Sequence, residues 1–191
     1  MTTVERLASY ENLFGLPENV VGEIIAGQLY THPRPAPAHA RASSVLGNKV
    51  GTPFDQSEGG GPSGWWILDE PELHLSEDIL VPDLAGWRRE RMPAFPKTAW
   101  FEIAPDWVSE VLSPATARTD RVLKLPRYTA TSVVHCWLID PDARTLEAYA
   151  NQEGRWLLLG TWGGDDMATI DPFAAIPLSS RAYGWSQTDE Q

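Results

Sequence analysis

Two strand-like segments constrain the fold of this chain most, because each places a carboxylate among residues typical of a protein core. The first, 81–85, contains Asp83, and the second, 105–112, contains Glu110 among valine and leucine residues. Ionised carboxylates are rarely buried unless they are paired or bound to a metal. We therefore expect the two segments to lie side by side in one sheet with their carboxylates converging. The spacing alone equally allows both carboxylates to be surface groups at strand ends.

Strand geometry decides which carboxylates could share an ion. Asp106 and Glu110 are roughly 13 Å apart along a strand that rises about 3.3 Å per residue, which is too far for one ion. A carboxylate on a neighbouring strand is about 4.8 Å away, so Asp83 is the natural partner of Glu110. Two carboxylates that chelate a divalent cation, with Lys124 nearby to stabilise developing negative charge, indicate a metal-dependent phosphodiesterase.

Two other polar residues interrupt segments that otherwise look structural. Glu23 lies inside the apolar segment 20–25. Because hairpins often have one face in water, the residues themselves favour a solvated position for Glu23 over a functional one. His39, at the start of a predicted helix, fits either a helix cap or a contact to phosphate.

The remaining pattern predicts a chain of strands with two helical regions. Apolar segments bounded by Gly, Pro, Asn and Asp predict strands at 20–25, 28–31, 65–68, 72–75, 79–85, 106–112, 133–140, 146–149 and 155–162. Helices are predicted over 2–14 and 38–50, followed by a helical stretch from 115 to about 131. In that stretch Pro126 either kinks the helix or occupies its first turn. The segment 51–64, rich in Gly, Pro and Ser, predicts a mobile loop. The pattern is that of an α/β or α+β fold in one domain, 1–185, with a disordered tail over 186–191.

Composition narrows the class of protein. The 191 residues are 42% hydrophobic and 21% charged, which is typical of a folded domain. The single cysteine, Cys136, excludes a disulfide framework or a cysteine zinc site within the chain. No apolar stretch of membrane-spanning length and no secretion signal is visible, so we expect a cytoplasmic protein without membrane contact. The net charge of −11 argues against a simple nucleic-acid-binding module.

Several motifs, taken in order, resemble the Uma-two family of restriction endonucleases, within the PD-(D/E)XK nuclease superfamily. The matching landmarks are the hairpin sequence at 23–29, the entry to the first helix at 35–40, the segments 81–83 and 105–114, then Asp120, Lys124, Tyr128 and 137–141. The resemblance extends from about residue 7 to about residue 182. Each motif is weak alone, whereas their order and spacing together are specific.

The resemblance implies a restriction-endonuclease-like mixed sheet flanked by helices, with additional antiparallel hairpins. It also implies that Asp83 and Glu110 bind Mg²⁺ or Mn²⁺, that Lys124 stabilises the transition state, and that Glu23 supplies a further catalytic carboxylate. Oxygen ligands suit such hard cations. In the usual superfamily motif the lysine stands two residues after the glutamate, where this chain has Leu112. Lys124 must therefore replace that lysine from the following helix.

The expected function is that of a Mg²⁺-dependent endonuclease that hydrolyses the phosphodiester bonds of DNA. Because a fold does not guarantee a function, one alternative is retained. It is a non-catalytic relative that binds a protein or a nucleic acid and keeps Asp83 and Glu110 for structure. A symmetric dimer, the commonest homo-oligomer, is the expected assembly.

Overall fold

A six-stranded mixed sheet forms the centre of the molecule. The computed structural model describes residues 7–56, 61–164 and 166–179. The strand order of the sheet is β10-β9-β8-β7-β6-β3. The strands are β3 (Trp65–Asp69), β6 (Leu84–Arg88), β7 (Trp107–Val111), β8 (His135–Asp140), β9 (Thr145–Gln152) and β10 (Arg155–Gly163). Only β7 and β8 pair in parallel, and all other neighbours are antiparallel. The expected restriction-endonuclease-like mixed sheet is confirmed.

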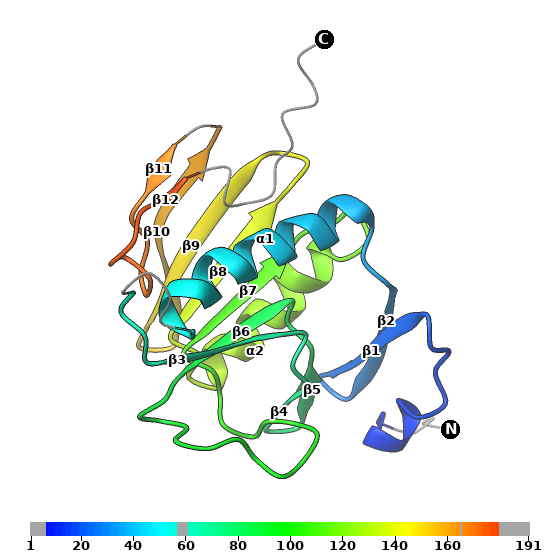
Figure 1. Ribbon diagram of the computed structural model, residues 1–191. Coiled ribbons are helices and arrows are strands. Elements are labelled where there is room, and N and C mark those ends of the chain that lie inside the picture. The colour runs from blue at the N-terminus through cyan, green and yellow to red at the C-terminus, as the bar shows by residue number, and fades with distance from the viewer. Residues whose placement is uncertain (1–6, 57–60, 165, 180–191) are drawn as a thin grey trace, which may run out of the picture.

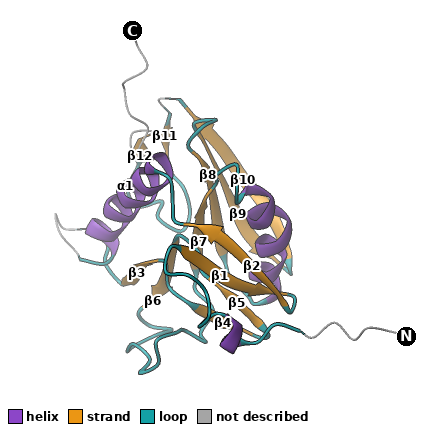
Figure 2. Cartoon of the chain, turned by 90° about the vertical axis from the view of Figure 1, so that its right-hand side faces the viewer, coloured by secondary structure: helices purple, strands orange, loops and turns teal. Residues whose placement is uncertain are grey.

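Helical segments cover both faces of this sheet (Figures 1 and 2). Helix α1 (Pro37–Phe54) packs on one face, where Leu46 and Val50 share a core with Trp107 and Trp137. On the other face lie η3 (Thr119–Lys124), a π-helical segment, and α2 (Leu125–Ala130). Side chains alternate between the faces of a strand, so Trp107 and Val111 face α1 while Val108 and Glu110 face α2.

A second, four-stranded sheet lies beside the first, in the order β2-β1-β5-β4. It consists of β1 (Val20–Ile25), β2 (Gln28–Pro33), β4 (Leu73–Leu75) and β5 (Asp78–Leu80). The hairpin of β1 and β2 extends from the main body in Figure 1. Its turn contains Ala26 and Gly27, both with positive φ, a conformation that glycine adopts readily in tight hairpin turns.

The prediction of one strand over 79–85 was wrong. Residues 78–80 form β5 of the second sheet, whereas residues 84–88 form β6 of the main sheet. Pro82 lies between them, and proline cannot donate a hydrogen bond to a strand ladder. The half that follows Asp83 nevertheless pairs with β7 as expected, with Leu84 opposite Ser109. The short segment 81–83 therefore connects the two sheets.

Other boundaries were predicted well, with two exceptions. Helix α1 continues to Phe54 through residues predicted as a loop, because Phe54 is buried against Phe173, with ring centroids 4.7 Å apart. Of the predicted helix 2–14, the described part contains only a short 3-10 helix, η1 (Tyr10–Asn12). A small hairpin of β11 (Met167–Ala168) and β12 (Leu178–Ser179) completes the fold. Residues 57–60 of the predicted loop and the predicted tail 186–191 lie outside the described residues.

Across the described residues, no helix is both long enough and apolar enough to cross a membrane.

Candidate active site

A buried lysine connects the three regions of the chain that carry the predicted site residues. The Nζ atom of Lys124 lies 2.8 Å from Oε1 of Glu110 and 3.0 Å from Oε1 of Glu23. It also donates a hydrogen bond of 3.1 Å to the carbonyl oxygen of Val81. Lys124, Glu110 and Glu23 are only 2%, 2% and 1% exposed. These three predicted residues therefore form one buried ionic cluster.

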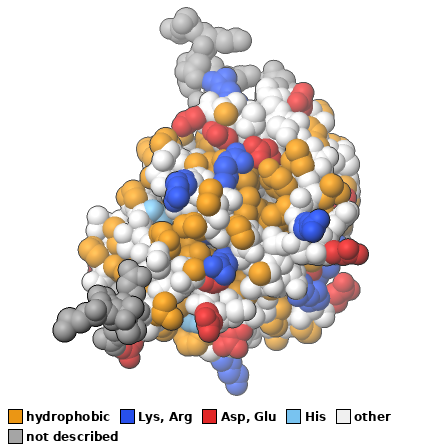
Figure 3. Space-filling model, turned by 180° about the vertical axis from the view of Figure 1, so that it is seen from behind, with side chains coloured by type: hydrophobic (Ala, Val, Ile, Leu, Met, Phe, Trp, Pro, Cys, Tyr) orange, Lys and Arg blue, Asp and Glu red, His pale blue; other side chains and the backbone are white. Residues whose placement is uncertain are grey.

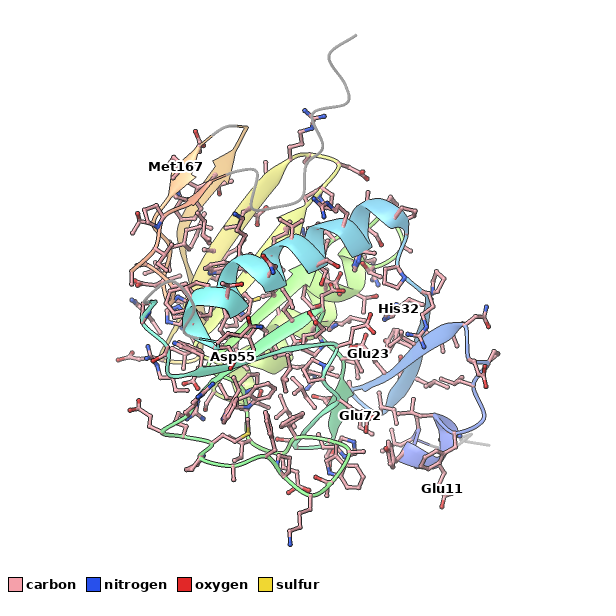
Figure 4. All side chains as sticks on the ribbon, in the orientation of Figure 1. Glu11, Glu23, His32, Asp55, Glu72 and Met167 are labelled. Carbon is pink, nitrogen blue, oxygen red and sulfur yellow. The ribbon has the colours of Figure 1, made fainter. Side chains whose placement is uncertain are left out.

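Each member of the cluster comes from a different element. Glu110 projects from β7 of the main sheet, and Lys124 ends the π-helical segment η3. Glu23 projects from β1 of the second sheet toward the main sheet, as Figure 4 shows. The same Glu23 accepts a 2.7 Å hydrogen bond from the backbone N–H of Val81, in the connection between the sheets. The solvated position favoured for Glu23 from the sequence was wrong, because the hairpin packs this face against Lys124.

Asp83 lies beside Glu110, immediately before β6. Its Oδ2 accepts a 2.7 Å hydrogen bond from the backbone N–H of Val111, the residue after Glu110. Its Oδ1 is 3.2 Å from Nε2 of His39, in the first turn of α1. The side chain of Asp83 is 15% exposed, so it is the carboxylate of the cluster nearest to solvent. Asp83 thus comes from the α1 side of the sheet, and Glu110 from the α2 side.

Asp106, which strand geometry excluded from sharing an ion with Glu110, has a separate role. Its Oδ1 accepts a 2.7 Å hydrogen bond from Arg91, and its Oδ2 accepts one of 2.8 Å from the backbone N–H of Arg88. Asp106 is therefore occupied in fixing the excursion that follows β6.

Two residues that sequence reasoning did not assign to the site complete it. Tyr128 donates a 2.5 Å hydrogen bond from its hydroxyl to Oε1 of Glu110. Asp120 lies 3.8 Å from Nζ of Lys124 through its Oδ1. Asp120, Lys124 and Tyr128 recur at four-residue intervals, which places side chains on one helical face. That spacing was the available signal, and with Glu110 known it would have selected both residues.

The cluster holds more negative than positive charge, and its pKa values show this. Burial raises the pKa of Glu110 well above its usual value, and Asp120, Asp83 and Glu23 add to the rise while Lys124 opposes it. Burial likewise raises the pKa of Asp120 to about 6, against the opposing effects of Lys124 and Thr116. Glu110, Glu23 and Asp120 therefore surround one lysine, with Asp83 acting on Glu110 and Asp120, in a site that disfavours full ionisation of its carboxylates.

For the two basic side chains, Lys124 and His39, burial acts on the pKa in the opposite direction, but neighbouring carboxylates outweigh it. Burial lowers the pKa of Lys124, but its attraction to Glu110, Glu23 and Asp120 outweighs burial and raises that pKa well above normal. Burial also lowers the pKa of His39, and its contact with Asp83 more than offsets this, so the net pKa is raised. Lys124 is thus a permanent positive charge at the carboxylates.

A pocket of about 270 Å³ leads from the surface to Asp83 and His39. One wall is the connection from β2 to α1, and the opposite wall is the turn 113–116. His32, whose Nε2 is 3.7 Å from Oε2 of Glu23, also lines it. Because Glu110 and Lys124 do not line the pocket, a ligand that enters it reaches Asp83 first.

The residues fit a hard divalent cation in chemistry and in charge. The available donors are carboxylate oxygens, which Mg²⁺ and Mn²⁺ prefer, and the carboxylate excess is what a bound cation would neutralise. Among the described residues, no group of three or more His, Cys, Asp or Glu side chains is arranged to hold a metal ion. Any ion at Asp83 and Glu110 would therefore complete its coordination with water or substrate oxygens, as Mg²⁺ commonly does.

Comparison with solved structures supports a restriction-endonuclease-like fold for this chain. The chain is similar to a "putative nuclease belonging to DUF820" from Anabaena variabilis, with a TM-score of 0.69 and 24% identity. The alignment covers 91% of this chain and 96% of the Anabaena chain. At this level of identity the likeness concerns the fold, which is of the restriction-endonuclease-like class. No curated protein matches the chain.

The family follows from the sequence itself. Residues 7–179 match the model of the Uma2 family, described as "Putative restriction endonuclease". The match spans most of the chain, which therefore belongs to the Uma2 family. The resemblance stated from the sequence motifs is confirmed.

Proposed function

We propose that this protein is a metal-dependent endonuclease that hydrolyses phosphodiester bonds in DNA. The supporting observation is the position of Asp83 beside Glu110 at the paired strands β6 and β7, with Nζ of Lys124 2.8 Å from Glu110. Membership of a family described as a restriction endonuclease supports nucleic acid as the substrate.

Asp83 and Glu110 are the residues that would hold Mg²⁺ or Mn²⁺ in this proposal. Such an ion, when bound, lowers the pKa of water and offsets the charge on a leaving oxygen. Tyr128 fixes the Glu110 carboxylate through its hydroxyl, and the backbone N–H of Val111 fixes Asp83. These two hydrogen bonds orient the carboxylates before any ligand arrives, which reduces the reorganisation needed for catalysis.

Lys124 supplies the positive charge for a phosphate at the same site. Its Nζ is held by Glu110, Glu23 and the carbonyl oxygen of Val81, so its position is set by two sheets. In a buried setting a fixed charge stabilises developing negative charge far more strongly than it does in water. In this proposal Glu23 acts as a positioning residue for Lys124.

The proposal is tested with purified protein and three variants. We expect Mg²⁺ or Mn²⁺ to raise the melting temperature of the wild type and to support cleavage of plasmid DNA and oligonucleotides. Asp83→Asn and Glu110→Gln should lose both the metal-dependent shift and the cleavage. The matched control is Asp142→Asn, in an exposed turn, which should retain both. No cleavage of any DNA, combined with no thermal shift by either metal, would refute the nuclease proposal.

One observation favours the second candidate, a non-catalytic relative that binds a protein or nucleic acid. Lys124 is already paired with two buried carboxylates, an arrangement that stabilises the seam between the sheets by itself. If this role is the whole function, DNA binding will persist without divalent cations and no substrate will be cleaved. The metal-dependent thermal shift separates the two candidates.

A further inference from the structure

The pocket in front of Asp83 limits the kind of nucleic acid that can reach the site. Glu110 and Lys124 are buried and do not line the pocket, whereas Asp83 does, so among the described residues this pocket offers a phosphate a path toward them past Asp83. Its volume of about 270 Å³ is slightly below the usual range of small-molecule pockets, about 300–1,000 Å³. That space suits a single nucleotide and excludes a base-paired segment.

The walls of the pocket are stiff, which argues against widening to admit a duplex. The wall between β2 and α1 contains Pro33 and Pro35, and α1 begins at Pro37. Each proline fixes its own φ and restricts the residue before it. The opposite wall is a tight turn in which Thr116 donates its backbone N–H to the Ser113 hydroxyl and to the Ser113 carbonyl oxygen.

The polar groups of the pocket match one strand of nucleic acid. Arg34 lies at the wall with its side chain 61% exposed. Its Nη1 is 3.8 Å from Glu70 and its Nη2 donates a long hydrogen bond of 3.4 Å to the carbonyl oxygen of Glu18, so other guanidinium donors remain for a phosphate. The hydroxyls of Ser113 and Thr116 lie on the opposite wall. Proline and alanine side chains between these groups offer an apolar surface to a base. The lining thus combines one arginine, two hydroxyls and an apolar surface with the carboxylates of Asp83 and Glu70 and two histidines, rather than a basic track along a duplex.

We infer that the substrate is single-stranded DNA, one nucleotide of which inserts between the β2–α1 connection and the turn 113–116 while Arg34 contacts a neighbouring phosphate. This inference rests on the proposed nuclease function and specifies its substrate. A target nucleotide within a duplex would first have to leave the base stack, at a cost in unstacking energy. Unpaired strands, strand ends and flaps are therefore the preferred substrates.

The experiment compares one labelled oligonucleotide, single-stranded, with its own duplex. We measure fluorescence anisotropy in Ca²⁺ and cleavage in Mn²⁺ at fixed ionic strength. The single strand should bind more tightly and be cut faster. Ala115→Trp, which fills the exposed mouth of the pocket, should weaken single-strand binding by about tenfold or more, the loss expected when one base loses its contacts. Ala130→Trp, at the exposed end of α2, is the matched control and should behave as wild type.

The possible failures are distinguishable. If the duplex is bound and cut as well as the single strand, or if Ala115→Trp changes nothing, the single-strand inference is overturned while the nuclease function stands. If the single strand binds in preference to the duplex and Ala115→Trp weakens that binding, but no DNA is cut in Mn²⁺, the inference about the ligand holds and the nuclease function fails. Circular dichroism of both tryptophan variants verifies that they are folded.

Discussion

Lys124 is the residue on which the candidate site depends most. A buried ammonium is expensive to desolvate, and this one is offset by Glu110, Glu23 and, at longer range, Asp120. Removing it leaves two fully buried carboxylates without a counter-charge. The lysine thus stabilises the fold as well as supplying charge to the proposed chemistry.

Lys124→Met should therefore reduce the free energy of unfolding by about 3–5 kcal/mol, the usual cost of removing one partner of a buried ion pair. Urea denaturation measures this. Adding Glu110→Gln to Lys124→Met should restore part of the loss, because the pair is energetically coupled. Lys97→Met, at an exposed position, is the control and should change stability by less than about 0.5 kcal/mol. Equal stabilities of Lys124→Met and Lys97→Met would show that the buried pair contributes little to stability.

Asp120 gives the cluster a dependence on pH. Its pKa of about 6 in the folded protein exceeds the ordinary value of 3.8, so the folded state binds this proton more tightly than the unfolded state does. The resulting stabilisation is fully present below pH 3.8 and is lost as the pH rises through about 6.

Asp120→Asn removes this titration. At pH 8 the variant should be more stable than wild type by at most about 3 kcal/mol, the equivalent of two pKa units. The difference should shrink toward zero as the pH falls from 7 to about 4. Denaturation at several pH values checks it, with Asp142→Asn in an exposed turn as the control. A constant difference across this range would contradict the raised pKa.

At the scale of elements, local patterns predicted most strands and α1 correctly, and the errors have identifiable causes. Residues 51–54 read as a loop because they contain Gly51 and Pro53, yet burial of Phe54 keeps them helical. The segment 79–85 read as one strand because its residues are apolar. Its division between two sheets depends on contacts with β1 and β7, which are distant in sequence.

The helical stretch after residue 115 was likewise predicted only in part from its local sequence. Both interpretations of Pro126 contained part of the answer, because α2 begins with this proline in its first turn while η3 precedes it without a break. The backbone N–H of Leu125 bonds to the carbonyl oxygen of Asp120, an interval of five residues typical of a π-helix. Proline has no N–H to continue that pattern. The presence of Pro126 indicates that the hydrogen-bond pattern changes here, but it does not indicate that the preceding helix is a π-helix.

The candidate site was predictable only in part for a similar reason. Asp83 and Glu110 followed from carboxylates in apolar strands, with Lys124 as the nearby lysine, and the family resemblance assigned the same three residues. The burial of Glu23 depends on how the β1–β2 hairpin docks against η3, which no local pattern encodes. Sequence spacing predicts which residues of one strand or helix share a face, but it does not predict which residues of two different sheets come into contact.

The edge strand β10 is the element best suited to self-association. It forms one end of the main sheet, and its residues Leu157, Leu158 and Leu159 are 46%, 50% and 40% exposed. From Trp156 to Gly163 it carries no charge. Edge strands usually carry charges or prolines that prevent pairing with another chain. An antiparallel pair of two β10 strands would be symmetric, in keeping with the dimer expected from the sequence.

Leu158→Lys should lower the self-association of the protein, because a charge on this edge opposes pairing with a second copy. Light scattering across a range of protein concentrations measures the mass. Leu7→Lys, at a leucine exposed to 67% away from this edge, is the control. A wild-type protein that remains monomeric at every concentration would dispose of the dimer.

At the scale of the whole molecule, the net charge of −11 opposes any approach of DNA. On the face seen from behind in Figure 3, basic side chains lie apart from one another among hydrophobic and acidic ones. In the proposed nuclease, attraction to phosphate would therefore have to be local to the site, and a cation would neutralise the carboxylate cluster before a phosphate enters.

We expect DNA to bind weakly in the presence of EDTA and more tightly when Mg²⁺ or Ca²⁺ is added. Asp83→Asn, which removes the carboxylate that lines the pocket, should bind DNA in EDTA about tenfold more tightly than wild type. Glu11→Gln, at an exposed carboxylate on η1, should not. Anisotropy with a labelled oligonucleotide provides the measurement. Wild-type binding that is equally tight in EDTA would show that electrostatic repulsion at the site is unimportant.

The contact between Lys124 and Glu23 would also determine when the proposed nuclease becomes active during its synthesis. Glu23 leaves the ribosome before Lys124, which follows only after both sheets have begun to emerge. Contacts between distant parts of a chain form late in folding. A nascent chain therefore carries the hairpin and its carboxylate without the lysine that completes the site. In a protein that cuts DNA, this order of assembly would delay activity until Lys124 and the helical segment that carries it have been synthesised.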